Sequence, residues 1–122
     1  MNLAMPEDAP LDDGQRNRIW ALGVSVFTLG LILFEQGRSE CVEAYGETVR
    51  YDQRIKDTAA EAVAHYNIGR AYHEIPGNVK LDVAEAAYGR SLELFNPDDV
   101  LAGSLAVKQI GMVHHARSTE AH

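Results

Sequence analysis

The 122-residue sequence repeats itself, and the repeats fall inside stretches with helical periodicity. Three glycines that each follow an apolar residue, Gly30, Gly69 and Gly111, are 39 and then 42 residues apart. Two Ala-Tyr-Gly triplets, which contain Gly46 and Gly89, lie between them. A glycine inside a helix costs about 1 kcal/mol relative to alanine, so glycines at repeating positions need a compensating gain. We expect the backbones of packed helices to approach each other closely at all of these glycines.

Periodicity, capping residues and breakers predict five helices and no strand, which makes the fold all-α. Asp12 or Asp13 can cap the first helix, and Asp57 or Thr58 can cap the third. Asparagine, proline and two aspartates at 96–99 form a start signal for the fifth. The predicted helices cover residues 13–36, 39–55, 58–75, 81–95 and, after that signal, up to 117.

A period near 40 residues that contains two helices is typical of an α-solenoid. The segments HYNIGRAY at 65–72 and AEAAYGRSLELFNP at 84–97 resemble the two helices of a tetratricopeptide repeat (TPR) unit. A second copy lies at 29–49, and QIGMVH at 109–114 begins a third. The period is longer than usual for the family and is similar to that of repeats in bacterial signalling and regulatory proteins.

The resemblance implies a right-handed α-solenoid of antiparallel helix pairs, with about five helices and two and a half repeats. We place this TPR-like helical domain at residues 13–117. A flexible acidic lead is expected at 1–12, where two prolines and three acids show no periodicity, and a flexible tail at 118–122.

In this family the first helix of each unit lines a concave groove that binds a partner. The resemblance therefore implies a non-catalytic adaptor that binds a peptide or segment of a protein partner. The groove positions carried over to this sequence are Phe27, Leu31, Phe34, Tyr66, Asn67, Arg70, His73, Lys108 and Met112. The cations among them favour an acidic or carboxylate-ended segment. An ordinary solvated helix face is the alternative interpretation.

The terminal helices also predict self-association, because a terminal helix has a neighbour on one side only and the first is apolar nearly all round. Large exposed apolar patches usually mark an interface, and a homodimer is the simplest assembly. The residues expected at this interface are Ile19, Trp20, Val24, Ile110 and Val113. Two alternatives to the adaptor stay open: a purely structural self-associating module and a chaperone-like holder of an apolar partner segment.

Composition and motifs exclude other classes of function. A net charge of -7 argues against a nucleic-acid partner, and the single Cys41 indicates a reducing, cytoplasmic compartment. The uncharged run at 19–34 spans about 24 Å, too short for a bilayer core of about 30 Å, so we expect a buried helix rather than a membrane span. We find no catalytic or phosphate-binding motif, and we expect no enzyme activity and no cofactor. The histidines lack metal-ligand spacing, so we expect no metal site, and packed histidines at His65 and His114.

Overall fold

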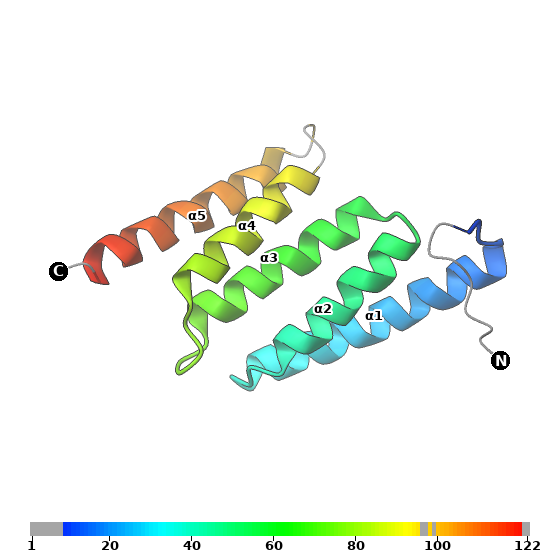
Figure 1. Cartoon of the computed structure of the whole chain (residues 1–122), viewed down its shortest axis with the longest axis horizontal. Coiled ribbons are helices and arrows are strands. Elements are labelled where there is room, and N and C mark those ends of the chain that lie inside the picture. The colour runs from blue at the N-terminus through cyan, green and yellow to red at the C-terminus, as the bar shows by residue number, and fades with distance from the viewer. Residues whose placement is uncertain (1–8, 96–97, 99, 121–122) are drawn as a thin grey trace.

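The computed structural model describes residues 9–95, 98 and 100–120 of the chain. This part forms five α-helices and no strand, which confirms the all-α prediction. The helices are α1 (Asp13–Glu35), α2 (Cys41–Arg54), α3 (Thr58–Glu74), α4 (Leu81–Leu94) and α5 (Val100–Glu120). Figure 1 shows them side by side in chain order, so that α1 and α5 form the two ends of a row.

Side-chain caps start α1 and α3 and decide between the candidates that the sequence left open. Asp12, not Asp13, caps α1, because its carboxylate accepts a hydrogen bond from the Gln15 N–H at 2.7 Å. The Gln15 side chain in turn accepts from the Asp12 N–H at 3.0 Å. Asp57 caps α3 by accepting from the Ala60 N–H at 3.0 Å. These caps satisfy main-chain groups that a helix start leaves without partners.

The turns after α1 and α3 each contain a glycine with a left-handed backbone conformation. Gly37 has a φ of 70° and Gly77 a φ of 81°, which residues with a side chain rarely adopt. The predicted start signal at 96–99 lies outside the described residues except for Asp98, and most of the predicted lead lies outside them too.

The predicted tail at 118–122 is wrong for residues 118–120, which continue α5. No glycine or proline follows Arg117 to end the helix. The Thr119 hydroxyl donates to the His115 carbonyl oxygen at 3.0 Å, within the same last turns.

Each helix packs mainly on the next helix along the chain. Two buried clusters form in this way. The first consists of Cys41, Tyr45, Ala71 and Ile75, with aromatic and aliphatic side chains of α1 packed against it. The second consists of Leu81, Ala84, Tyr88 and Val113, and Tyr66 and Tyr72 from α3 pack against that one. Each cluster therefore joins three successive helices.

A buried tyrosine covers a helical glycine in each cluster. A Cβ placed on Gly30 would lie 2.6 Å from the Tyr45 ring, and one on Gly69 would lie 2.6 Å from the Tyr88 ring. Such distances leave no room for a side chain, so α1 approaches α2, and α3 approaches α4, through a glycine. The prediction that these two positions exclude a side chain is confirmed, but the predicted approach of two backbones is wrong. The partner is a tyrosine ring rather than a second backbone.

The same prediction is wrong for Gly46, Gly89 and Gly111. Among the described residues, no atom outside the glycine's own stretch of helix lies within 4 Å of a Cβ built on any of the three. These glycines repeat in sequence at positions where the helices leave open space, so close packing does not explain them.

The aromatic neighbours of the two tyrosines also repeat. Phe27, three residues before Gly30, contacts Tyr45 with ring centroids 5.7 Å apart. Tyr66, three residues before Gly69, contacts Tyr88 at 5.6 Å. Tilted aromatic pairs at this distance are favourable. The pairs α1–α2 and α3–α4 therefore share one contact pattern.

The two tyrosines differ at the hydroxyl group. The Tyr88 hydroxyl is hydrogen-bonded to Nδ1 of His73, four residues after Gly69, at 3.3 Å. The equivalent position in the first pair holds Phe34, which has no polar atom. The buried Tyr45 hydroxyl has no hydrogen-bond partner within the described part of the chain.

Candidate functional site

Two neighbouring hollows on the surface lie where α1, α2 and α3 meet. The outer cleft has a volume of ≈ 660 Å³, and the inner cleft beside it has ≈ 250 Å³. Trp20 lines both, and we call the two adjoining clefts together the α1–α3 groove. The outer cleft is lined by Arg16, Asn17, Trp20, Ile55, Lys56, Asp57, Thr58 and Ala59. The inner cleft is lined by Trp20, Gly23, Val24, Phe27, Thr48, Asp52, Ala60 and Val63.

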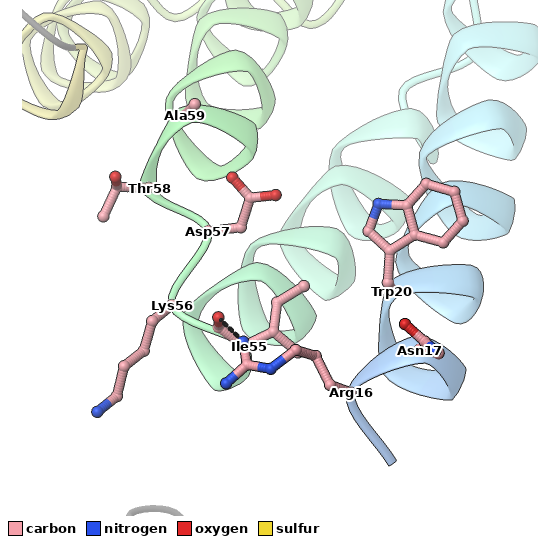
Figure 2. Close-up of a pocket in the computed structure, with 8 residues that line it drawn as sticks. All are labelled: Arg16, Asn17, Trp20, Ile55, Lys56, Asp57, Thr58 and Ala59. Carbon is pink, nitrogen blue, oxygen red and sulfur yellow. Dashed lines mark hydrogen bonds between the residues drawn. The ribbon is translucent and has the colours of Figure 1, made fainter. Parts of the chain in front are cut away.

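The outer cleft is polar and lies at the turn between α2 and α3. Figure 2 shows Arg16 reaching from α1 to the Ile55 carbonyl oxygen, to which it donates a hydrogen bond at 2.6 Å. The Trp20 ring stands on the α1 side, and the Lys56 side chain extends away from the other residues drawn. Arg16 and Asp57 both bind main-chain groups here, so these two side chains stabilise the turn between α2 and α3.

The inner cleft combines apolar walls with one buried acid. Trp20, Val24 and Val63 are exposed at its edge. Asp52 is only 6% exposed, and its Oδ2 atom has no hydrogen-bond partner among the described residues. Desolvation, together with the charges of Asp57 and Glu61, raises the pKa of the Asp52 carboxyl to about 6.

Sequence reasoning did not single out Asp52, although a signal for it exists. Asp52 follows Tyr45 by seven residues and Thr48 by four, and all three are buried. Residues at this spacing share one helix face. Extending the buried face of Tyr45 along α2 therefore places a carboxylate in the interior.

Three predicted groove residues lie along the C-terminal half of α1. Phe27 and Phe34 are half-buried and pack against the first cluster, whereas Leu31 is exposed. The Arg70 guanidinium stacks over the Phe34 ring at 4.7 Å and also binds Glu74, with Nε 2.7 Å from the carboxylate. Arg70 thus has an anionic partner within its own helix, which weakens the expectation that it recruits an acidic segment.

The other predicted residues of α3 hold helices together or bond within α3. The Tyr66 hydroxyl accepts a hydrogen bond from Gln109 of α5 at 3.2 Å. Asn67 donates to the Val63 carbonyl oxygen at 3.0 Å, inside its own helix. His73 packs edge-on against Tyr88. These residues are half-buried, so much of their surface already serves the fold.

Lys108 and Met112 are exposed on α5. They belong to the last helix of the row, and neither lines the α1–α3 groove. Of the nine predicted groove residues, only Phe27 lines the α1–α3 groove. The others lie elsewhere on α1, α3 and α5.

The predicted self-association residues divide into two groups. Trp20 and Val24 are exposed at the α1–α3 groove, and Ile19 is half-buried. Val113 is fully buried in the second cluster, and Ile110 packs against that cluster. The prediction of an exposed interface is wrong for Val113, because α5 turns this side chain towards α4.

The outer side of α1 carries a second set of exposed aliphatic side chains: Leu22, Leu29 and Ile32. Among the helices described, α1 alone is long and apolar enough to cross a membrane by length and composition. Its most apolar window has a mean hydropathy of 1.6 and is only 17% buried, so core packing does not account for its composition. A core helix or a signal sequence meets the same criteria, which makes this weak evidence for a membrane.

The histidines and the cysteine take ordinary structural places. His65 is half-buried and 3.1 Å from Glu61, whereas the His114 side chain is 58% exposed, so the prediction of packing is wrong for His114. Burial raises the pKa of the Cys41 thiol, which lowers its reactivity. Within residues 9–95, 98 and 100–120, no group of three or more histidine, cysteine or acidic residues could hold a metal ion.

No protein-family description, no curated protein and no solved structure matches this chain.

Proposed function

We propose that the chain is a short TPR-like α-solenoid and a non-catalytic adaptor, which binds a segment of a protein partner in the α1–α3 groove. One observation carries this proposal: Trp20, Val24 and Val63 line an open groove and remain exposed to solvent. Covering aromatic and aliphatic side chains is favourable by about 25 cal/mol per Å² of apolar surface. A large aromatic residue at the centre of such a groove is a common anchor for a partner.

The repeated contact pattern supports the solenoid part of the proposal. The Gly30–Tyr45 contact joins α1 to α2, and the Gly69–Tyr88 contact joins α3 to α4 in the same way. One helix-pair unit that stacks on a copy of itself is the organisation of a solenoid.

The geometry favours apolar contacts over an acidic anchor at Arg70. Glu74 already neutralises this cation, and Phe34 covers one face of its guanidinium. We therefore propose that the partner segment binds mainly at the inner cleft. Arg70 instead packs α3 against Phe34 of α1.

Site-specific photo-cross-linking tests the proposal. A photoreactive residue at Val63, on the edge of the groove, is compared with one at Val83 on α4, because these valines are 40% and 41% exposed. We expect a partner segment to be cross-linked from Val63 and not from Val83, and peptide mass spectrometry identifies it. Equal cross-linking from both positions contradicts a role for the groove.

A third probe at Leu29 addresses self-association, which the exposed outer side of α1 favours as a second candidate. One outcome supports the structural self-associating module instead: the Leu29 probe cross-links two copies of the chain, and the Val63 probe cross-links no other protein. Cross-links from Val63 to many unrelated apolar segments support the chaperone-like alternative.

A further inference from the structure

One buried carboxylate, that of Asp52, has no apparent role in stabilising the fold. Apart from the Tyr45 hydroxyl, the other buried polar side chains of the described residues form hydrogen bonds: Thr48 donates to Ala44, Glu61 accepts from Gln53, and Ser91 donates to Ala62. Asp52 is 6% exposed, and its Oδ2 has no partner among the residues described. An unpartnered buried carboxylate is costly, so its presence in a cleft calls for a ligand that supplies the missing donor.

The charges around Asp52 are acidic. Asp57 and Glu61, both at the start of α3, are the charged groups that act on it, and both raise its pKa. Glu61 has partners of its own in His65 and Gln53. Two cations line the adjoining outer cleft. Arg16 is hydrogen-bonded to the Ile55 carbonyl oxygen, and the Lys56 side chain extends away from the other residues drawn in Figure 2. No ion pair to Asp52 is formed within the described part of the chain, so the inner cleft has an uncompensated negative charge.

We infer that the inner cleft binds a basic side chain, arginine or lysine, of the partner protein, with its charged end at Asp52. This inference rests on the proposed function and names the residue type that the groove recognises. Gly23 and Thr48 are buried beside Asp52 in the lining, whereas Val24, Val63 and Trp20 form the exposed edge.

The shape and chemistry of the cleft fit the two parts of such a side chain. Its aliphatic stem would lie along Val24, Phe27 and Val63, because arginine and lysine bury their methylene groups against apolar surface. Its charged end would form a charge-assisted hydrogen bond with Asp52, which is among the strongest hydrogen bonds in proteins. The exposed Trp20 ring at the edge offers a further favourable surface to a cation. A volume of ≈ 250 Å³ accommodates one long side chain.

Trp20 is the single tryptophan of the chain, so its fluorescence reports on the cleft without a label. The probes are capped pentapeptides of alanine and valine with a central arginine, or with a central norleucine, which keeps an aliphatic stem and lacks the charged end. We expect the arginine peptide to change Trp20 fluorescence and to bind about tenfold or more tightly than the norleucine peptide. Asp52→Asn should remove this preference by weakening the arginine peptide about tenfold or more.

Glu43→Gln is the matched control, because it removes one negative charge from an exposed site on the same helix. It should leave the preference for arginine unchanged, and circular dichroism confirms that both variants are folded. Equal binding of the two peptides to the wild-type protein overturns the inference but leaves the adaptor function standing. Binding of the arginine peptide that survives Asp52→Asn also overturns it. If neither peptide binds, the inference fails, and cross-linking from Val63 separately decides the proposed function.

Discussion

Tyr45 and Tyr88 occupy matching places in two helix pairs, yet their hydroxyl groups have different environments. Both side chains are fully buried and each covers a glycine. Tyr88 shares a hydrogen bond with His73, whereas Tyr45 has no partner among the described residues because Phe34 stands at the corresponding position. A buried hydroxyl without a partner costs about 1–3 kcal/mol, whereas a satisfied one contributes about 1 kcal/mol.

The two tyrosine-to-phenylalanine variants should therefore have opposite effects on stability. Tyr88→Phe removes a hydrogen bond and should lower the free energy of unfolding by about 1 kcal/mol. Tyr45→Phe removes an unsatisfied group and should leave the free energy of unfolding unchanged or raise it by about 1 kcal/mol. Urea denaturation of the two variants and the wild-type protein measures the difference. Equal losses in both variants would mean that the Tyr45 hydroxyl is satisfied in solution.

The helix pairs α1–α2 and α3–α4 are joined by a glycine on one helix and a tyrosine on the other. The tyrosine ring lies where a Cβ would be, so the spacing between the helices depends on the absence of a side chain. The glycines on the partner helices, Gly46 and Gly89, face open space. In each helix pair, therefore, one glycine is in contact with a tyrosine ring and the other has open space beside it.

Alanine substitution should separate these two groups. Gly30→Ala and Gly69→Ala should each lower the free energy of unfolding by about 1–3 kcal/mol, because a buried ring cannot move aside without disturbing its cluster. Gly46→Ala and Gly89→Ala should each raise it by about 0.5–1 kcal/mol through the higher helix propensity of alanine. Thermal unfolding followed by circular dichroism measures all four. A gain in stability at Gly30 or Gly69 would show that the helices can separate at little cost.

The described part of the molecule is a row of five helices. Its stability depends on pH partly through one buried acid, Asp52. The folded state raises the pKa of Asp52 to about 6, whereas an unfolded aspartate has a pKa of about 3.9. Between these values the folded state binds the proton more tightly than the unfolded state does. The contribution of Asp52 to the free energy of unfolding therefore rises as the pH falls from about 7 to about 4, and it is unfavourable at neutral pH.

Asp52→Asn should therefore increase the free energy of unfolding at pH 7.5 by about 1–3 kcal/mol, and the gain should shrink towards pH 4. Glu43→Gln, which removes an exposed charge, should show no such trend. Urea denaturation of both variants and the wild-type protein across this pH range measures the differences. The same pH dependence in all three proteins would mean that the Asp52 carboxyl is solvated.

The sequence by itself determined the elements of this protein. Its capping aspartates, turn glycines and helical periodicity predicted all five helices, because these signals act within one or two helical turns. It also contains the repeated glycines, and at Gly30 and Gly69 a tyrosine ring occupies the space that a Cβ would need.

Only the tertiary structure decided which faces of these helices are covered. Val113 was expected at an exposed interface and is buried against α4, whereas Arg70 was expected to be available to a partner and is bound by Glu74. The α1–α3 groove and the position of Asp52 in it depend on how three helices meet. Such contacts join residues far apart in the chain, and the periodicity of a single helix carries no information about which neighbour will cover each of its sides.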